Sequence, residues 1–314
     1  MNSTQKNWVW FVAILALIVG GGFYLANSRR TELGKSFAYS VDEYRQVDPS
    51  LIHYVEVDPV FPDLGKLSAL TIAPNGQLVV GGERGIDIFP MGEKKQPAPM
   101  QSVPRGGTPS CLAVDEDGTI FAGMDDHVEI FPKGGGKKAW PSPGPKAYLT
   151  SIAVDDEFVF VADAGSRCIW RYGREGGEPL KIEGEPKFYV PSPYFDLDVG
   201  TDGSLWVVNP GRHALENYRA DGQAISSWES ASFRIEGFSG CCNPAHFALM
   251  PDGSFLTAEK GLVRVKIHNL DGSLRCVVAA PDPFDEPVGD LAVDGVGRIF
   301  VLMGNRVRVF KEKM

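Results

Sequence analysis

A pattern with a period of 40 to 50 residues, which occurs six times, constrains the fold of this 314-residue chain more than any other feature. Each copy reads as a strand, a tight turn, a second strand, a loop, and a third strand that ends in an aromatic or apolar residue. Four of the tight turns carry Asn-Gly or Asp-Gly, which favour a two-residue β-hairpin because both positions tolerate a positive φ angle. The copies span residues 70–89, 111–131, 151–172, 196–218, 246–268 and 290–310.

Repeats of this length with three or four strands each are typical of β-propellers, in which every blade buries its faces against its neighbours. We therefore predict an all-β, six-bladed β-propeller over residues 51–314. After Phe310 too few residues remain for an outer strand in the last blade, whereas residues 51–61 read as a strand without a blade of its own. We expect this N-terminal strand to complete the sixth blade and close the ring.

An apolar segment precedes the repeats. Residues 8–26 carry no charge, and a helix of this length, at about 1.5 Å per residue, matches the core of a bilayer. Trp8, Trp10 and Tyr24 lie near its ends, where aromatic rings favour the membrane interface, and no good signal-peptidase site follows. We predict a short tail (1–7), a transmembrane signal anchor (8–26), a polar tether (27–50), and a propeller (51–314) on the periplasmic side.

Charge and cysteine content exclude two classes of protein. The net charge is −9, whereas nucleic-acid binding requires a basic surface that neutralises phosphates. The five cysteines include no C-x2-C pair, so a fold held by disulfides is not expected. The expected partners are the membrane, through the N-terminal helix, and an unidentified protein, peptide or glycan on one face of the propeller.

Three features of the repeats resemble NHL-repeat propellers: a Pro-x-x-(Leu/Ile/Phe)-Ala start, an Asp-Gly hairpin and an Arg-(Val/Ile)-x-x-Phe third strand. The resemblance covers about residues 60–310, and residues 240–266, GCCNPAHFALMPDGSFLTAEKGLVRVK, resemble a block of bacterial, membrane-anchored NHL proteins. It implies a binding scaffold. A minority of related propellers, such as the peptide-amidating lyase and gluconolactonase-type enzymes, hold a metal in the central channel. A fold by itself transfers none of these functions.

The repeat alignment also predicts which side chains meet at the channel. In each repeat, one residue near the start of the innermost strand occupies an equivalent position. Because side chains alternate between the two faces of a strand, these six side chains are expected on the same face of their strands. We expect these side chains to gather at one mouth of the channel, either as a metal or polar-ligand site or as hydrogen-bonding groups between blades. The position is occupied by Ala69, Cys111, Ser151, Asp196, His246 and Asp290.

The strongest metal candidates are Cys241, Cys242 and His246, with Cys111, Asp196 and Asp290 as a second tier. Thiolate and imidazole suit copper or zinc, and a turned loop would let both adjacent thiols face one ion. A vicinal disulfide and simple burial of two small apolar residues are the alternatives. Three cationic side chains nearby would form a charged edge or a solvated face: Lys260, Arg264 and Lys266.

These observations leave three functions open. The first is a membrane-tethered binding or scaffold propeller, with a soft-metal site at the channel mouth. The second is a metal-dependent enzyme or a redox or metal-handling protein that uses Cys241, Cys242 and His246. The third is a gluconolactonase-like hydrolase that uses Asp196 and Asp290 with a hard divalent ion. No nucleophile–base pair is identifiable from the sequence.

Overall fold

The computed structural model describes residues 42–91, 99, 101–103, 107–280 and 286–313, together with residues 2, 8, 10, 14–21 and 24. The chain divides into two compact units, Met1–Glu43 and Tyr44–Met314. Eight of the nineteen residues of the predicted anchor and fifteen of the twenty-four residues of the predicted tether lie outside the described residues. Among the residues that the structure does describe, none of the helices has the length and apolar character needed to cross a bilayer. The anchor at 8–26 therefore stays a prediction.

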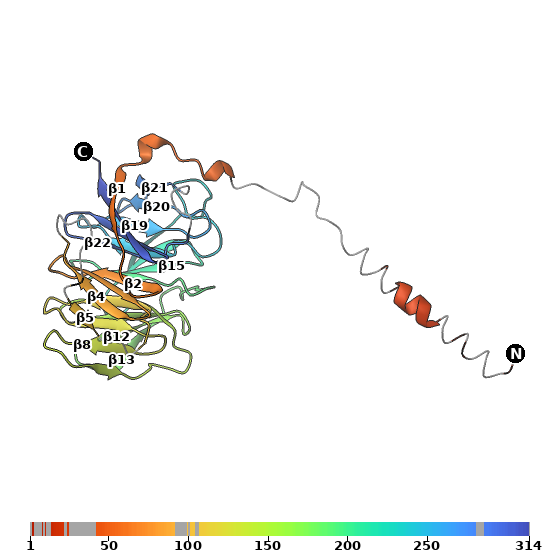
Figure 1. Cartoon of the computed structure of the whole chain (residues 1–314), viewed down its shortest axis with the longest axis horizontal. Coiled ribbons are helices and arrows are strands. Elements are labelled where there is room, and N and C mark those ends of the chain that lie inside the picture. Colours follow the sequence, from red (N-terminus) through yellow and green to blue (C-terminus); the bar gives the residue numbers. More distant parts are fainter. Residues whose placement is uncertain are drawn as a thin grey trace. The chain divides into compact units, whose positions relative to one another are not determined.

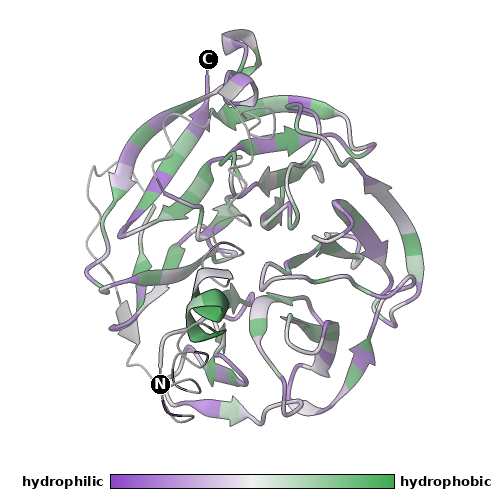
Figure 2. Ribbon diagram, turned by 90° about the vertical axis from the view of Figure 1, so that its right-hand side faces the viewer, coloured by the Kyte–Doolittle hydropathy of each residue, from purple (hydrophilic) through white to green (hydrophobic). Residues whose placement is uncertain are grey.

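The second unit is built from six four-stranded antiparallel sheets, which confirms the six-bladed propeller. Figure 2 shows these sheets arranged around a central axis. The first three sheets contain β2 (Leu67–Ile72), β3 (Leu78–Gly82), β4 (Gly85–Phe89) and β5 (Gln101–Val103); β6 (Cys111–Val114), β7 (Ile120–Gly123), β8 (Val128–Phe131) and β9 (Lys138–Trp140); and β10 (Leu149–Val154), β11 (Phe158–Asp163), β12 (Cys168–Gly173) and β13 (Gly176–Ile182) (Figure 1).

The remaining sheets contain β14 (Leu197–Val199), β15 (Leu205–Asn209), β16 (Ala214–Tyr218) and β17 (Ala224–Glu229); β18 (His246–Leu249), β19 (Phe255–Ala258), β20 (Val265–His268) and β21 (Leu274–Ala279); and β22 (Asp290–Val293), β23 (Ile299–Met303), β24 (Arg306–Glu312) and β1 (Tyr54–Val60). Two 3-10 turns, Asp42–Tyr44 and Pro49–Leu51, precede β1.

The predicted hairpin turns join the first and second strands of their sheets. In the third sheet, where Asp156-Glu157 replaces the Asp-Gly pair, the carboxylate of Asp155 holds the turn instead. It accepts hydrogen bonds from the backbone N–H groups of Glu157 (2.8 Å) and Phe158 (2.6 Å). The four predicted glycines adopt the positive φ that such turns require: Gly76 (79°), Gly118 (81°), Gly203 (76°) and Gly253 (82°).

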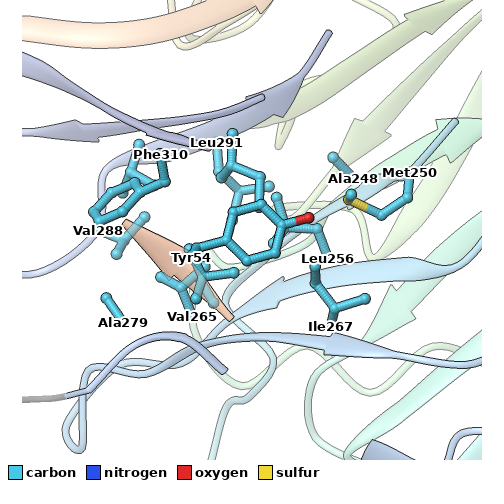
Figure 3. Close-up of a cluster of buried hydrophobic side chains, with 14 of the residues drawn as sticks. Tyr54, Ala248, Met250, Leu256, Val265, Ile267, Ala279, Val288, Leu291 and Phe310 are labelled. Atoms are coloured by element: carbon cyan, nitrogen blue, oxygen red, sulfur yellow. The ribbon is translucent and has the colours of Figure 1, made fainter. Parts of the chain in front are cut away.

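The N-terminal strand β1 pairs antiparallel with β24 and becomes the outermost strand of the sixth sheet, as the sequence predicts. The Arg308 guanidinium binds the Glu56 carboxylate across this pair, with Nε 2.8 Å from Oε1. Tyr54 of β1 is buried in a cluster of side chains from the fifth and sixth sheets (Figure 3). The closure is thus both a strand pairing and a hydrophobic contact.

The described hydrophobic core is divided among the boundaries between blades. Each of the six buried clusters combines side chains of two neighbouring sheets, including the boundary between the sixth and the first. Removal of apolar surface from water therefore stabilises the ring at every boundary. The core holds the innermost strands side by side around the axis, which positions the side chains described next.

Candidate functional site

The innermost strands define two faces of the propeller. We call the mouth at which β2, β6, β10, β14, β18 and β22 begin the start face, and the opposite mouth, where they end in hairpin turns, the turn face. These strands line a small central cavity of about 220 Å³. A second cavity of about 1010 Å³ opens among the turns of the second to fourth sheets.

Four of the six aligned side chains do gather in the central cavity. Cys111, Ser151, Asp196 and Asp290 all line it. His246 lies beside them, with its Nδ1 atom 3.9 Å from Oδ2 of Asp196 and 18% of its side chain exposed. The repeat alignment therefore predicted correctly that these side chains lie close together. Their hydrogen bonds show what each side chain does there.

Both channel carboxylates bridge neighbouring blades. Asp196 accepts one hydrogen bond from the N–H of Leu197 (2.9 Å) and another from the N–H of Phe247 in the next sheet (2.8 Å). Asp290 repeats this geometry: it accepts from the N–H of Leu291 (2.8 Å) and from the N–H of Leu70 in the first sheet (2.8 Å). These carboxylates satisfy edge N–H groups that would otherwise stay unpaired.

The same kind of contact joins the third and fourth sheets. The Ser151 hydroxyl donates to the carbonyl of Leu197 (3.2 Å), and the Thr150 hydroxyl donates to the carbonyl of Phe195 (2.6 Å). Asp198 adds a further bridge to the fifth sheet through the N–H of Leu249 (2.9 Å). The alternative in which the aligned residues hydrogen-bond between blades is thus the one that the structure displays.

Burial sets the protonation of this cluster. It raises the pKa of Asp196 to about 7, and burial together with the nearby Asp196 raises the pKa of Asp290 to about 8. Burial also raises the pKa of the Cys111 thiol and lowers that of His246 to about 4. Near neutral pH the imidazole is uncharged and the carboxyl groups are partly protonated.

Cys241 and Cys242 lie in the connection between β17 and β18. Their Sγ atoms are 3.4 Å apart, and both thiols are free, with Cys241 exposed and Cys242 buried. Within residues 42–91, 107–280 and 286–313, no group of three or more His, Cys, Asp and Glu side chains has the geometry to hold a metal ion. Copper or zinc binding by these cysteines and His246 therefore remains a prediction.

The expected cationic edge beside the cysteines is wrong for Arg264 and Lys266, whereas Lys260 is partly exposed. Arg264 and Lys266 are fully buried, and both bind the buried carboxylate of Glu259. The distances are 2.7 Å from Arg264 Nη2 to Glu259 Oε2 and 2.8 Å from Lys266 Nζ to Glu259 Oε1. Burial alone would raise the pKa of Glu259, but the charges of Lys266 and Arg264 lower it below its usual value. Burial lowers the pKa of Lys266 to about 8.

This charged cluster holds the long loop before β18. Glu259 accepts hydrogen bonds from the Ser239 N–H (2.8 Å) and hydroxyl (2.9 Å), and Arg264 donates to the carbonyl of Phe233 (3.0 Å). Lys266 donates to the carbonyl of Ile235 (3.0 Å). Charged side chains on a strand were expected at a surface, but a loop distant in sequence covers them and supplies their partners.

The larger cavity, on the turn face, was not predicted. Two turns bring six acidic side chains to it, and its walls include the buried rings of Phe121 and Trp140. The first turn lies between β6 and β7 and the second between β10 and β11. Four of the acids are exposed, and their carboxylates form no hydrogen bond or ion pair with the residues that the structure describes: Glu116, Asp117, Asp156 and Glu157.

Two cationic side chains, Lys138 and Arg174, line this cavity. The Lys138 ammonium lies 3.9 Å from the Glu175 carboxylate, which also lines the cavity. Arg174 binds the carboxylate of Asp115, donates to the carbonyl of Asp155 (2.7 Å), and lies with its guanidinium carbon 5.5 Å from the centre of the Phe121 ring. The charge of Arg174 is thus already neutralised by Asp115. The acidic character of the remaining turns is visible in the sequence as VDEDG and VDDE, but their proximity depends on the packing of the second sheet against the third.

No protein-family model and no curated protein matches the chain. Among solved structures it is similar to a streptogramin B lyase (TM-score 0.60, 10% identity, 85% of this chain and 100% of that chain). It is also similar to a catalytically inactive virginiamycin B lyase from Staphylococcus aureus with quinupristin (0.59, 13%, 83% and 99%) and to the WD40 β-propeller domain of Doa1 (0.55, 15%, 79% and 79%). These likenesses show the propeller fold, and the resemblance to NHL repeats stays a prediction.

Proposed function

We propose that this propeller is a binding module whose turn-face cavity accepts a positively charged, extended segment of a partner protein. The observation that carries the proposal is the 1010 Å³ cavity bordered by two acidic turns. A space of this volume is at the upper end of small-molecule pockets, so it accommodates several side chains.

The charge of the cavity favours a cationic ligand. Glu116, Asp117, Asp156 and Glu157 are exposed at its rim. The two cations of the lining each have a carboxylate beside them, Asp115 for Arg174 and Glu175 for Lys138. Carboxylates clustered around a concave surface raise the local concentration of cations and accelerate association with a basic partner. Lysine or arginine side chains would meet these carboxylates, and their aliphatic stems would contact apolar wall atoms.

The rest of the propeller supports a scaffold role. On the start face, Asp196 and Asp290 are engaged by strand N–H groups of neighbouring blades. That engagement favours a binding function over the gluconolactonase-like alternative, in which these carboxylates would ligate a divalent ion. A metal-dependent function would need a further ligand beside Cys241 and Cys242, and elemental analysis of the purified chain tests it.

The predicted anchor at 8–26 fits the same proposal, because a tethered module would concentrate its partner at the membrane surface. With the propeller on the periplasmic side, the partner would be a basic segment of a secreted or membrane protein.

The test is a titration of the full-length chain, in mild detergent, with a fluorescent peptide of eight alternating Lys and Ala residues. We expect binding that weakens with added salt, and no binding of the matching Glu–Ala peptide. The double variant Asp117→Asn/Glu157→Gln should bind roughly tenfold more weakly.

The matched control is Glu178→Gln/Glu312→Gln, which removes the same charge from exposed positions on β13 and β24. It should bind as the unchanged chain does. Equal binding of the two peptides, or equal weakening by both double variants, would show that the cavity is not the binding site.

A further inference from the structure

We infer that Cys241 and Cys242 form a redox-active dithiol, which closes to a vicinal disulfide by exchange with a small-molecule disulfide. The juxtaposition of the two sulfur atoms carries this inference. In extended chain the side chains of adjacent residues point in opposite directions. Here the loop turns, and the Sγ atoms lie 3.4 Å apart.

Hydrogen bonds on both sides of the pair hold this arrangement. Before it, the N–H and hydroxyl of Ser239 donate to the Glu259 carboxylate at 2.8 and 2.9 Å. After it, the side-chain oxygen of Asn243 accepts from the Lys260 N–H (2.8 Å), and its amide nitrogen donates to the Lys260 carbonyl (3.1 Å). Because both flanks are anchored to the same segment after β19, the sulfur atoms are kept close before any reaction begins.

The two thiols differ in the way that a stepwise exchange requires. Cys241 is exposed, so a dissolved disulfide can reach it, whereas Cys242 is only 1% exposed. An accessible thiol beside a second, shielded thiol is the arrangement of an attacking and a resolving cysteine.

The exchange balances with oxidised glutathione as the oxidant. The Cys241 thiolate attacks one sulfur of glutathione disulfide, forming a mixed disulfide and releasing one glutathione thiolate. The Cys242 thiolate then attacks the Cys241 sulfur, forming the Cys241–Cys242 bond and releasing the second glutathione thiolate. The protein loses two protons and two electrons, and the glutathione disulfide gains them.

Chain geometry makes such a bond reversible rather than structural. Adjacent Cα atoms are about 3.8 Å apart, which is below the usual separation of about 4.4 to 6.8 Å in disulfides. The ring is therefore strained and readily reduced. A two-sulfur metal site is less favoured, because structural zinc sites use four ligands, and the described residues supply no third one beside this pair.

The experiment uses the full-length chain, purified under reducing conditions in mild detergent and then incubated with oxidised glutathione. We expect the intact mass to fall by two hydrogen atoms and two of the five thiols to become unreactive. Proteolysis should place the bond in the peptide that contains both cysteines, and dithiothreitol should reverse it.

Single variants separate the two steps. Cys242→Ser should accumulate a stable glutathione adduct at Cys241, and Cys241→Ser should not react over the same period. Cys276→Ser, which removes a buried thiol from β21, is the matched control and should react as the unchanged chain does. Equal thermal transitions of the reduced proteins confirm that the variants fold.

Three results would overturn the inference. They are a glutathione adduct that persists at Cys241 in the unchanged chain, complete lack of reaction at both thiols, and a stoichiometric metal ion whose removal by a chelator is required for reaction. The last result would assign the pair to metal binding instead.

Discussion

The start face and the turn face of the propeller use acidic side chains in opposite ways. On the start face, Asp196, Asp290 and Glu259 are all engaged by backbone N–H groups or by buried cations. On the turn face, Asp117 and Glu157 lie on exposed turns at the rim of a large cavity. The same residue type therefore stabilises one face and remains available to a ligand on the other.

This difference shows that polar side chains lining the channel of a closed ring do not by themselves indicate a functional site. Innermost strands expose edge N–H groups to the channel, and a channel with low solvent access makes each unpaired group costly. Polar side chains at these positions are therefore needed to accept hydrogen bonds from the N–H groups of the ring itself. The turns lie outside this constraint, so their charges are free for recognition.

The largest effect should come from the buried cluster behind the start face. Glu259→Gln would leave Arg264 and Lys266 buried with their charges uncompensated, and we expect a loss of about 3–5 kcal/mol of unfolding free energy. Chemical denaturation measures it, with the exposed Glu178→Gln as the control. A loss below about 1 kcal/mol would mean that the cluster does not hold the loop.

Asp290→Asn should have the next largest effect. The carboxyl group of Asp290 accepts the N–H groups of Leu70 and Leu291 through its two oxygens, whereas the Asn amide has a single acceptor oxygen. We expect a loss of about 1–3 kcal/mol at pH 6. Asp117→Asn on the turn face is the matched control, and equal losses in the two variants would erase the contrast between the faces.

A pH series sharpens this prediction. The pKa of Asp290 is raised to about 8 in the folded chain, so between the unfolded value near 4 and pH 8 the folded state binds more protons than the unfolded state. Its contribution to stability is complete below pH 4 and is lost as the pH rises through 8. The stability that Asp290→Asn loses relative to the unchanged chain should therefore shrink between pH 6 and pH 9, as measured by thermal unfolding. A loss that stays constant over this range would contradict the raised pKa.

The smallest effect on stability should come from the turn face. Asp117→Asn/Glu157→Gln should change the unfolding free energy by less than about 0.5 kcal/mol, because both side chains are exposed. The same variant should lose roughly tenfold in affinity for the basic peptide. If stability falls as far as in Asp290→Asn, these carboxylates are structural and the two faces are alike.

Much of the fold could be predicted from local sequence. The Asp-Gly turns and the strands that flank them specify each hairpin, because the hydrogen bonds and φ angles involved lie within a few residues. The missing outer strand after Phe310 pointed to β1, which does pair with β24. The repeat alignment also located Asp196 and Asp290 at the channel.

The roles of these side chains could not be predicted in the same way. Asp290 accepts from Leu70, 220 residues away in the sequence, and Lys266 finds its carbonyl partner Ile235 on a loop of another connection. A strand pattern indicates which side chains share a face, but it does not reveal what covers that face. For this reason the cationic edge was expected where a buried charge cluster lies.

The sequence by itself determined the number of blades, the turns within them and the strand that closes the ring, because strand alternation and turn chemistry are local properties of the chain. Only the tertiary structure decided which acidic side chains are paired and which are free. Pairing depends on N–H groups, cations and loops brought together by the packing of one blade against the next, and that packing is set by the whole ring.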